Sequence, residues 1–253
     1  MRGTWTICRK ELTSYFASPI AYAVMALYAV VFGLFFYSAV AFFANPQFQA
    51  QTMGRPLNIH EMVIAPVLMN TSVIGLFFIP MMTMRLFAEE KRSGTIELLA
   101  TSPVSDLAII IGKWLSALIL YTSVWLVSSF SVLYLFIWGK PDWKPVLISY
   151  LGVLLQGAAL LAIGTFLSTM TKNQIIAGVA GFAVSILLWV VNWLGQIDSG
   201  VMGTVFNRLS IVTHLEPFSK GVLDTKDVTY FVSLTFLGLF LSARSLESLR
   251  WRS

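Results

Sequence analysis

The sequence predicts an all-α polytopic membrane protein with six transmembrane helices, and two observations support this fold class. Of 253 residues, 57% are hydrophobic and 11% are charged, whereas soluble globular proteins carry about 25% charged residues. Six long uncharged runs also separate the charges along the chain. Five of the runs reach the roughly 20 apolar residues that cross a hydrocarbon core. The last run has 16 residues, and its flanking Lys226 and Arg244 can snorkel to the headgroups.

A buried helix in a large soluble core would explain one such run, but it does not explain six. We therefore expect residues 1–253 to form a single transmembrane domain. The predicted transmembrane helices span residues 19–43, 62–84, 107–138, 146–170, 174–197 and 227–243.

Residues 1–17 predict an amphipathic helix that lies in the membrane interface. Aromatic and apolar side chains recur at helical spacing on one face, with basic and hydroxyl side chains opposite. This pattern is typical of helices that lie on a membrane without crossing it. A frayed terminus is the alternative. The residues expected to define the interfacial helix are Trp5, Arg9, Lys10, Leu12 and Phe16.

The third predicted span begins at Ser105-Asp106, because these residues suit a helix N-cap and first turn. Lys113 follows one to two turns later, and we expect it to snorkel back to the headgroups. Small residues then mark the fourth span, at Gly152, Gly157 and Gly164, and the fifth, at Ala177 and Gly181. Small residues allow close helix approach, so both spans should pack tightly in the bundle.

The distribution of basic residues predicts the orientation. With six spans and the N-terminus inside, 11 of the 17 lysines and arginines fall in cytoplasmic segments. The positive-inside rule then places both termini in the cytoplasm, in a multi-pass protein of the inner (cytoplasmic) membrane. The net charge of +5 follows from this topology, and nothing in the sequence indicates nucleic-acid binding.

The longest external connector, residues 198–226, has a helix-like apolar pattern. Since structureless loops of this length are uncommon, we expect short helices at or dipping into the outer membrane face. His60 and His214 are the only histidines, and we place both in external connectors, solvated or locally hydrogen-bonded.

The sequence also lacks most catalytic chemistry. It has no phosphate-binding loop, no cluster of histidines for a metal, and one cysteine, Cys8. No uncompensated carboxylate lies in the middle of a predicted span, where ion-driven carriers need one. We therefore expect no enzyme activity and no bound cofactor, in a protein that takes its energy from a partner or is passive.

The most polar stretch of the chain is the connector between the second and third spans, residues 88–104. Residues Phe87 to Asp106 carry six formal charges. Gly94 to Ala100 can form about two turns of helix, with Gly94 allowing an unusual backbone angle at the entry. Two turns are unstable alone, so either a partner surface or the headgroup layer must hold them. A solvated loop that only enforces topology is the alternative.

The order of residues in this connector resembles the cytoplasmic signature of type 2 ABC exporter permeases. The signature is Glu-x-x-x-Gly-Thr-x-Glu-x-Leu, then Ser-Pro-x-Ser, then Gly-Lys before an apolar span. The matching residues are Glu90, Gly94, Thr95, Glu97, Leu99, Ser102, Pro103, Ser105, Gly112 and Lys113. The chain end resembles the branch of gliding-motility and nitrous-oxide-reductase-maturation permeases.

The resemblance implies that the connector is a coupling helix, which docks on a separate cytoplasmic ATPase that binds ATP and magnesium. It also implies a second permease subunit, in a homodimer or heterodimer, with a passage between spans one, two and five. The docking residues it implies are Glu89, Glu90, Lys91, Arg92, Gly94, Thr95, Ile96, Glu97, Leu98, Leu99, Ser102 and Pro103.

Two other functions remain open from the residues alone. The first is a membrane anchor or assembly factor that binds a cytoplasmic partner without moving a substrate. The second is an intramembrane enzyme, which the missing catalytic clusters make a weaker hypothesis. The sequence does not identify a cargo, because a mostly apolar bundle suits lipid-linked, peptide or small hydrophobic molecules equally.

Overall fold

The computed structural model describes residues 2–51, 58–96, 104–139, 141–197 and 200–250. These residues form helices and no strand. Six of the helical segments are long and apolar enough to cross a membrane, which confirms the predicted fold class. In chain order the described helices are α1 (Arg2–Ala17), α2 (Pro19–Phe43), α3 (Pro46–Gln51), η1 (His60–Ile64), α4 (Ala65–Thr83), α5 (Ala88–Ser93), α7 (Asp106–Trp138), α8 (Trp143–Met170), α9 (Gln174–Ile197), α10 (Val201–Leu209), α11 (Ile211–Ser219) and α12 (Thr225–Arg250).

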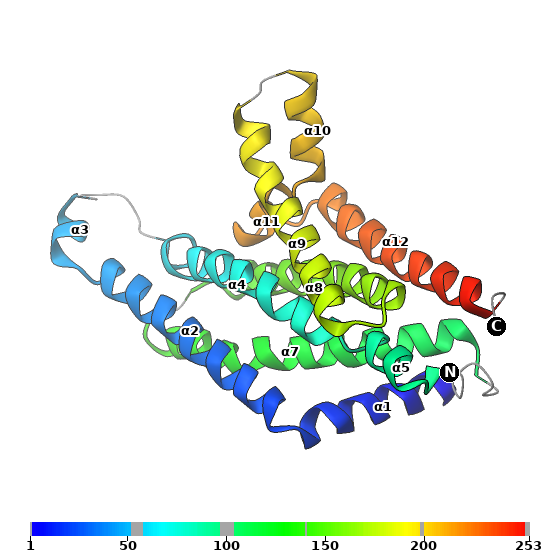
Figure 1. Ribbon diagram of the computed structural model, residues 1–253. Coiled ribbons are helices and arrows are strands. Elements are labelled where there is room, and N and C mark those ends of the chain that lie inside the picture. Colours follow the sequence, from blue (N-terminus) through cyan, green and yellow to red (C-terminus); the bar gives the residue numbers. More distant parts are fainter. Residues whose placement is uncertain (1, 52–57, 97–103, 140, 198–199, 251–253) are drawn as a thin grey trace.

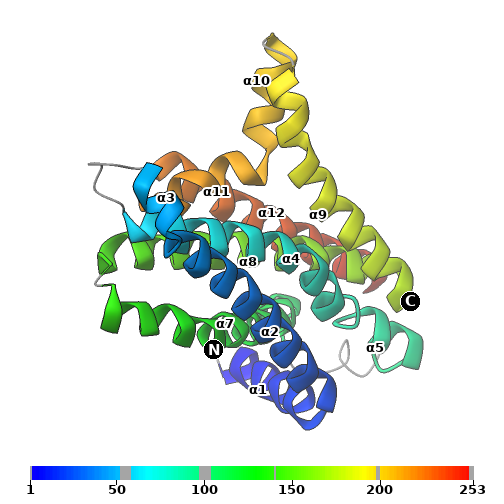
Figure 2. The same cartoon turned by 90° about the vertical axis from the view of Figure 1, so that its left-hand side faces the viewer.

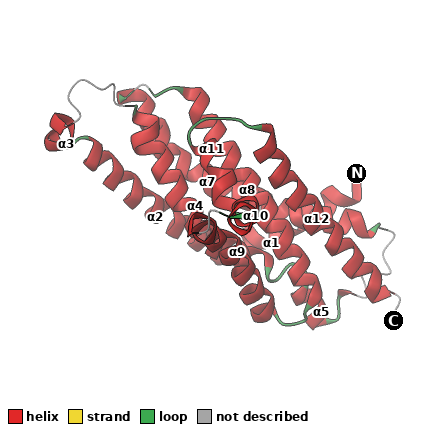
Figure 3. Ribbon diagram, turned by 90° about the horizontal axis from the view of Figure 1, so that it is seen from above, coloured by secondary structure: helices red, strands yellow, loops and turns green. Residues whose placement is uncertain are grey.

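Helix α8 is the centre of the bundle. It packs against α4, α7, α9, α11 and α12 (Figure 1). Helix α1 lies along α7, and α9 pairs with α10 in a hairpin that projects away from the other helices (Figure 2). Seen from above, α2 lies at the edge of the bundle with α3 beyond its end (Figure 3).

An aromatic cluster fills the space between α2, α7 and α8. Trp125 of α7 is 2% exposed, and its ring makes edge-to-face contacts with Tyr28, Phe32, Tyr121 and Tyr150 at centroid distances of 5.4–6.3 Å. Such pairs add about 0.5–1.5 kcal/mol beyond the area they bury. The first span is therefore held to the bundle at its middle by edge-to-face ring contacts.

Glycines allow the close approach around α8 that the sequence predicts. A methyl group at Gly157 would lie 2.1 Å from the Tyr121 ring of α7, and one at Gly152 would lie 2.4 Å from Phe218 of α11. At Gly164 it would lie 2.3 Å from the Thr83 hydroxyl of α4. These three glycines therefore seat α7, α11 and α4 on one helix.

The connector between α9 and α12 contains two short helices, as the sequence predicts. His214 of α11 lies 2.7 Å from an Asp227 carboxylate oxygen and stacks on the Tyr230 ring. The Tyr230 hydroxyl donates a hydrogen bond to the Leu209 carbonyl at 2.6 Å. His214 is thus locally hydrogen-bonded, and its contacts hold the connector against the start of α12.

His60 differs from the expectation of a residue in an external connector, because it begins the helix that continues into α4 and is 1% exposed. Its Nε2 lies 2.9 Å from the Ser219 carbonyl oxygen. Ser149 donates from its hydroxyl to the Phe218 carbonyl at the same place. A buried polar ring needs such partners, so His60 joins η1 to the end of α11. Within the described residues there is no group of three or more metal-ligand side chains.

Substituting Gly157 by alanine tests the central packing. We expect Gly157→Ala to lower stability by about 1–3 kcal/mol, because the added methyl group overlaps the buried Tyr121 ring. Gly75→Ala is the matched control, since its methyl group would meet the Tyr121 hydroxyl at an ordinary 3.8 Å. Thermal unfolding in detergent micelles measures both. Equal midpoints for the two variants would contradict the packing described.

Candidate functional site

The connector after α4 is fixed to the bundle by a serine of α8. The backbone amides of Phe87 and Ala88 both donate to the Ser168 hydroxyl oxygen at 3.1 Å, and that hydroxyl donates to the Met84 carbonyl at 3.1 Å. Helix α5 has no capping side chain of its own at Phe87. Ser168 therefore satisfies amides at the start of α5 that would otherwise lack a partner.

Helix α5 ends at Gly94, whose φ of +73° is in the left-handed region that glycine tolerates. The unusual backbone angle expected there is thus present and ends the helix over Ala88–Ser93, while most of the helix predicted over residues 94–100 lies outside the described residues. Ile96 is half-buried against the core. Five of the predicted docking residues lie outside the described residues: Glu97, Leu98, Leu99, Ser102 and Pro103.

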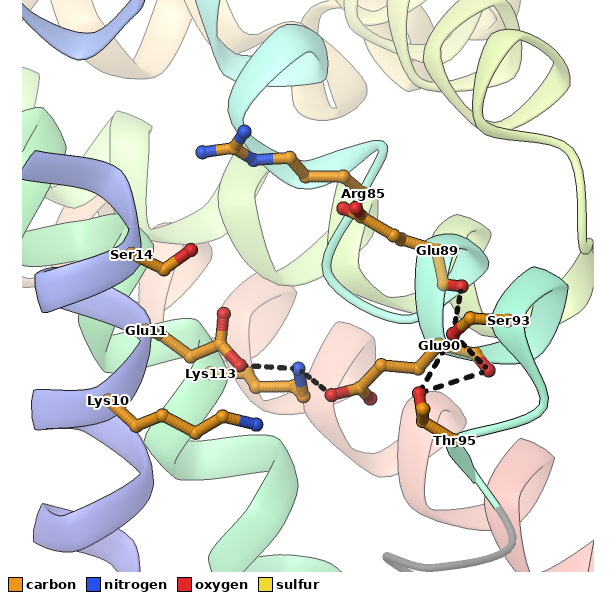
Figure 4. A pocket seen from close by; sticks show the side chains of 9 residues that line it. All are labelled: Lys10, Glu11, Ser14, Arg85, Glu89, Glu90, Ser93, Thr95 and Lys113. Atoms are coloured by element: carbon orange, nitrogen blue, oxygen red, sulfur yellow. Dashed lines mark hydrogen bonds and ion pairs between the residues drawn. The ribbon is translucent and has the colours of Figure 1, made fainter. Parts of the chain in front are cut away.

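A buried ion cluster joins α5 to α1 and α7. The Lys113 ammonium of α7 lies 2.8 Å from a carboxylate oxygen of Glu11 in α1 and 2.8 Å from one of Glu90 in α5 (Figure 4). The Lys113 side chain is 2% exposed, and the two carboxylates are 17% and 14% exposed. The expectation that Lys113 snorkels to the headgroups is therefore wrong, because two carboxylates neutralise it inside the protein.

The cluster requires α1 to approach α7 closely, and Gly112 permits this. A methyl group at Gly112 would lie 2.8 Å from the Thr4 carbonyl oxygen and 3.0 Å from the Ile7 side chain. On the same side of α1, Cys8 is fully buried and Tyr15 is 4% exposed. The Gly-Lys pair of the sequence signature therefore has two structural roles, one for backbone approach and one for charge.

The predicted residues of the interfacial helix divide between two faces of α1. Trp5 is 63% exposed, and Arg9 and Lys10 are also exposed, while Leu12 and Phe16 are half-buried. The buried stripe includes Cys8 and Tyr15, and the Tyr15 hydroxyl donates to the Met82 carbonyl of α4 at 2.9 Å.

The charges of α5 also divide between two sides. Glu90 pairs with Lys113, and the Lys91 ammonium donates to the Thr169 carbonyl at the end of α8. Glu89 and Arg92 are exposed, as are Ser93, Gly94 and Thr95. The resemblance implies that all four charges face a partner surface, and in the structure Glu90 and Lys91 also bind this chain's own helices.

Sequence reasoning missed Glu11 as a site residue. It is the single acidic residue in α1, a helix that the sequence predicts to lie in the membrane interface with basic side chains on one face. That isolation was the available signal. Its partner Lys113 is 102 positions away, so no local pattern indicates the pair.

Around the cluster lies a cavity of about 460 Å³. Its walls come from α1, the turn after α4, α5 and α7, so it opens where these four segments meet (Figure 4). The residues that line it are Lys10, Glu11, Ser14, Arg85, Glu89, Glu90, Ser93, Thr95 and Lys113.

The comparisons with known proteins identify the family. The model of the ABC-2 family transporter protein matches residues 5–236. This chain belongs to the ABC-2 transporter family. The matched range includes most of α1, the whole connector and the first half of α12, and no curated protein matches the chain. With its six apolar helices, this ABC-2 family member is a multi-pass membrane permease component of an ABC transporter.

Removing the Lys113 charge tests the buried cluster. We expect Lys113→Met to lower stability by about 3–5 kcal/mol, because it leaves two buried carboxylates without a cation. Combining it with Glu11→Gln and Glu90→Gln should recover most of that loss. Lys172→Met, in an exposed turn, is the control and should change stability by less than about 0.5 kcal/mol. Thermal unfolding measures all variants; a triple variant as unstable as the single one would contradict the pairing.

The reactivity of Cys8 tests the packing of α1. Burial raises the pKa of the Cys8 thiol, and the nearby Glu11 carboxylate raises it further. Since the thiolate is the reactive form, we expect slow maleimide labelling of the folded protein. As pH rises, labelling should accelerate later than for an exposed control, Thr13→Cys in a Cys8→Ser background. Equal rates at neutral pH would show that α1 is not packed as described.

Proposed function

We propose that this chain is the permease subunit of an ABC exporter and that a separate cytoplasmic ATPase docks on its connector. In this proposal ATP and magnesium bind to the ATPase, and the chain itself holds no cofactor. Two permease subunits, identical or paired with a homologue, form the passage. The connector then transmits ATP-driven motion of the ATPase to the helices that line it.

The observation that carries the proposal is the two-sided construction of α5. Its outer side presents Glu89 and Arg92 to solvent, where charged side chains set the orientation of a docking partner. Its inner side is bound to the bundle through Glu90 and Lys91. A solvated loop that only enforced topology would have no need of these inner contacts.

Through its inner contacts, a displacement of α5 would be transmitted to several helices of the bundle. Lys113 links α5 to α7 and to α1, and Ser168 links the start of α5 to α8. Packed elements move as units and not by continuous deformation. A push on α5 would therefore move α1, α7 and α8 together, and would not be absorbed in the connector.

The exposed apolar faces support a second permease subunit. In the most apolar stretch of each helix, only 11% of the residues are buried in α2 and 22% in both α9 and α12. Near α2 and α9, Phe77 of α4 and Phe182 of α9 form a ring pair at 4.7 Å, with Phe77 52% exposed. The faces of α2, α4 and α9 belong to spans one, two and five, where we expect the passage to form between the two subunits.

Reversing the chemistry of the predicted docking segment tests the proposal. We expect Glu97→Arg combined with Leu99→Asp to weaken ATPase binding about 30-fold, because a buried apolar anchor contributes roughly 2 kcal/mol or more. Glu247→Arg, which reverses an exposed charge on α12, is the control and should bind normally. Pull-down of the ATPase by the purified permease measures the affinity.

Unchanged ATPase binding by the double variant would contradict docking at the connector. Normal binding without ATP-dependent movement of any substrate would instead favour the membrane anchor or assembly factor. Thermal unfolding of the double variant, expected to match the wild type, separates lost docking from lost folding.

A further inference from the structure

Arg85 differs from Lys113 because it forms no ion pair among the described residues, whereas Lys113 forms two. It lies in the turn between α4 and α5, and its guanidinium stacks on the Tyr15 ring at 4.5 Å. No carboxylate of the described chain lies within 4.0 Å of it. The stacked ring orients the guanidinium, and none of the described carboxylates forms an ion pair with it.

Arg85 also lies between two cavities of different character. One is the charged cavity of about 460 Å³ around Lys113. The other, of about 230 Å³, is enclosed by helices α1, α2, α4, α7 and α9, and its walls are mostly apolar. Arg85 and Glu89 line both cavities. Among the other residues that line the second cavity are Tyr15, Val24, Phe78, Met81, Met82 and Met84.

The walls of the second cavity suit a flexible hydrocarbon chain. Three methionines line it, and methionine adapts its shape to irregular apolar ligands. Met81 is 51% exposed, so this wall reaches the surface of the bundle. At 230 Å³ the cavity is smaller than the roughly 300–1,000 Å³ of a complete ligand pocket. It therefore has room for part of a chain only, and the polar end must lie elsewhere.

The pairing of the charges in the first cavity indicates what that polar end is. Lys113 is already neutralised by Glu11 and Glu90. Arg85 is the cation without a bound carboxylate at the junction, and its planar guanidinium binds carboxylates and phosphates through two parallel hydrogen bonds. Glu89 also lines both cavities, but it is exposed to solvent, whereas Arg85 is half-buried. Water therefore screens the carboxylate more strongly than the guanidinium. Charge complementarity at the junction therefore favours an acidic group.

We infer that the two cavities together bind an amphiphile with an acidic head group, which enters from the membrane leaflet on the α5 side. Its head group contacts Arg85 and its chain follows Val24, Phe78 and Met81. The assignment of this amphiphile as cargo rests on the permease function proposed above. The binding site itself needs only the described residues of one chain.

Photo-crosslinking tests the site on the full-length permease without an ATPase. In phosphatidylcholine vesicles, a palmitic acid that carries a diazirine on its chain should label peptides of α2 and α4. Arg85→Gln should reduce the labelling about tenfold, because it removes a charge-assisted contact. Lys172→Gln, the same charge change in an exposed turn on the same side, should leave labelling unchanged.

A second pair of measurements separates the head group from the chain. A diazirine-bearing hexadecanol, which lacks the acid, should label weakly in the wild type and equally weakly in Arg85→Gln. Val24→Phe, which narrows the apolar cavity while leaving Arg85 in place, should also reduce labelling by the acid. Unlabelled palmitate should compete with the probe and acetate should not. Equal labelling by acid and alcohol, or competition by acetate, would overturn the inference.

An ATPase assay with the same palmitate and the same variant distinguishes a failure of this binding site from a failure of the proposed function. In a complex with its ATPase, palmitate should stimulate ATP hydrolysis in the wild type and not in Arg85→Gln. If the ATPase binds the permease and hydrolyses ATP but Arg85→Gln is labelled as strongly as the wild type, the binding site is wrong and the permease function still stands. Labelling that depends on Arg85 in a permease that binds no ATPase would support the site and overturn its use for cargo.

Discussion

The burial of one ammonium group constrains how three separate helices meet. Lys113 lies in a helix that is apolar almost throughout, at 2% exposure, and an unpaired charge there would cost several kcal/mol. Its counterions come from α1 and α5 and not from its own helix. Helices α1 and α5 must therefore both pack on α7 before the charge is satisfied. Association of the polar segments is thus a condition for folding the apolar ones.

That condition explains features that otherwise look unrelated. Gly112 precedes Lys113 because the helix that supplies Glu11 must come within contact of the α7 backbone. Ser168 caps α5 because the helix that supplies Glu90 is six residues long and cannot be stable alone. The inner side of the connector is therefore rigidly held, while its outer side remains available to a partner.

The apolar architecture was predictable because each span is a local property of the sequence. Run length, spacing of small residues and the Ser105 cap all act within one helix, and Ser105 does accept a hydrogen bond from the Ala108 amide. The cluster was not predictable, because Glu11 and Lys113 meet across 102 positions. From its position alone Lys113 is predicted to snorkel, because a lysine near the end of a membrane helix usually extends its ammonium group to the headgroups. Only the fold reveals that a better partner than water is within reach.

The two cations at the base of the bundle show how a structural charge differs from one available to a ligand. Lys113 has two carboxylates for one positive charge, so its charge is satisfied without a ligand. Arg85 has an aromatic ring and no bound carboxylate among the described residues. Had Glu11 and Glu90 been distributed one to each cation, both charges would be satisfied and neither would attract an anion. Placing both carboxylates beside Lys113 does not change the total charge of the four residues. Among the described residues it leaves the oriented guanidinium of Arg85 unpaired where the charged cavity meets the apolar one.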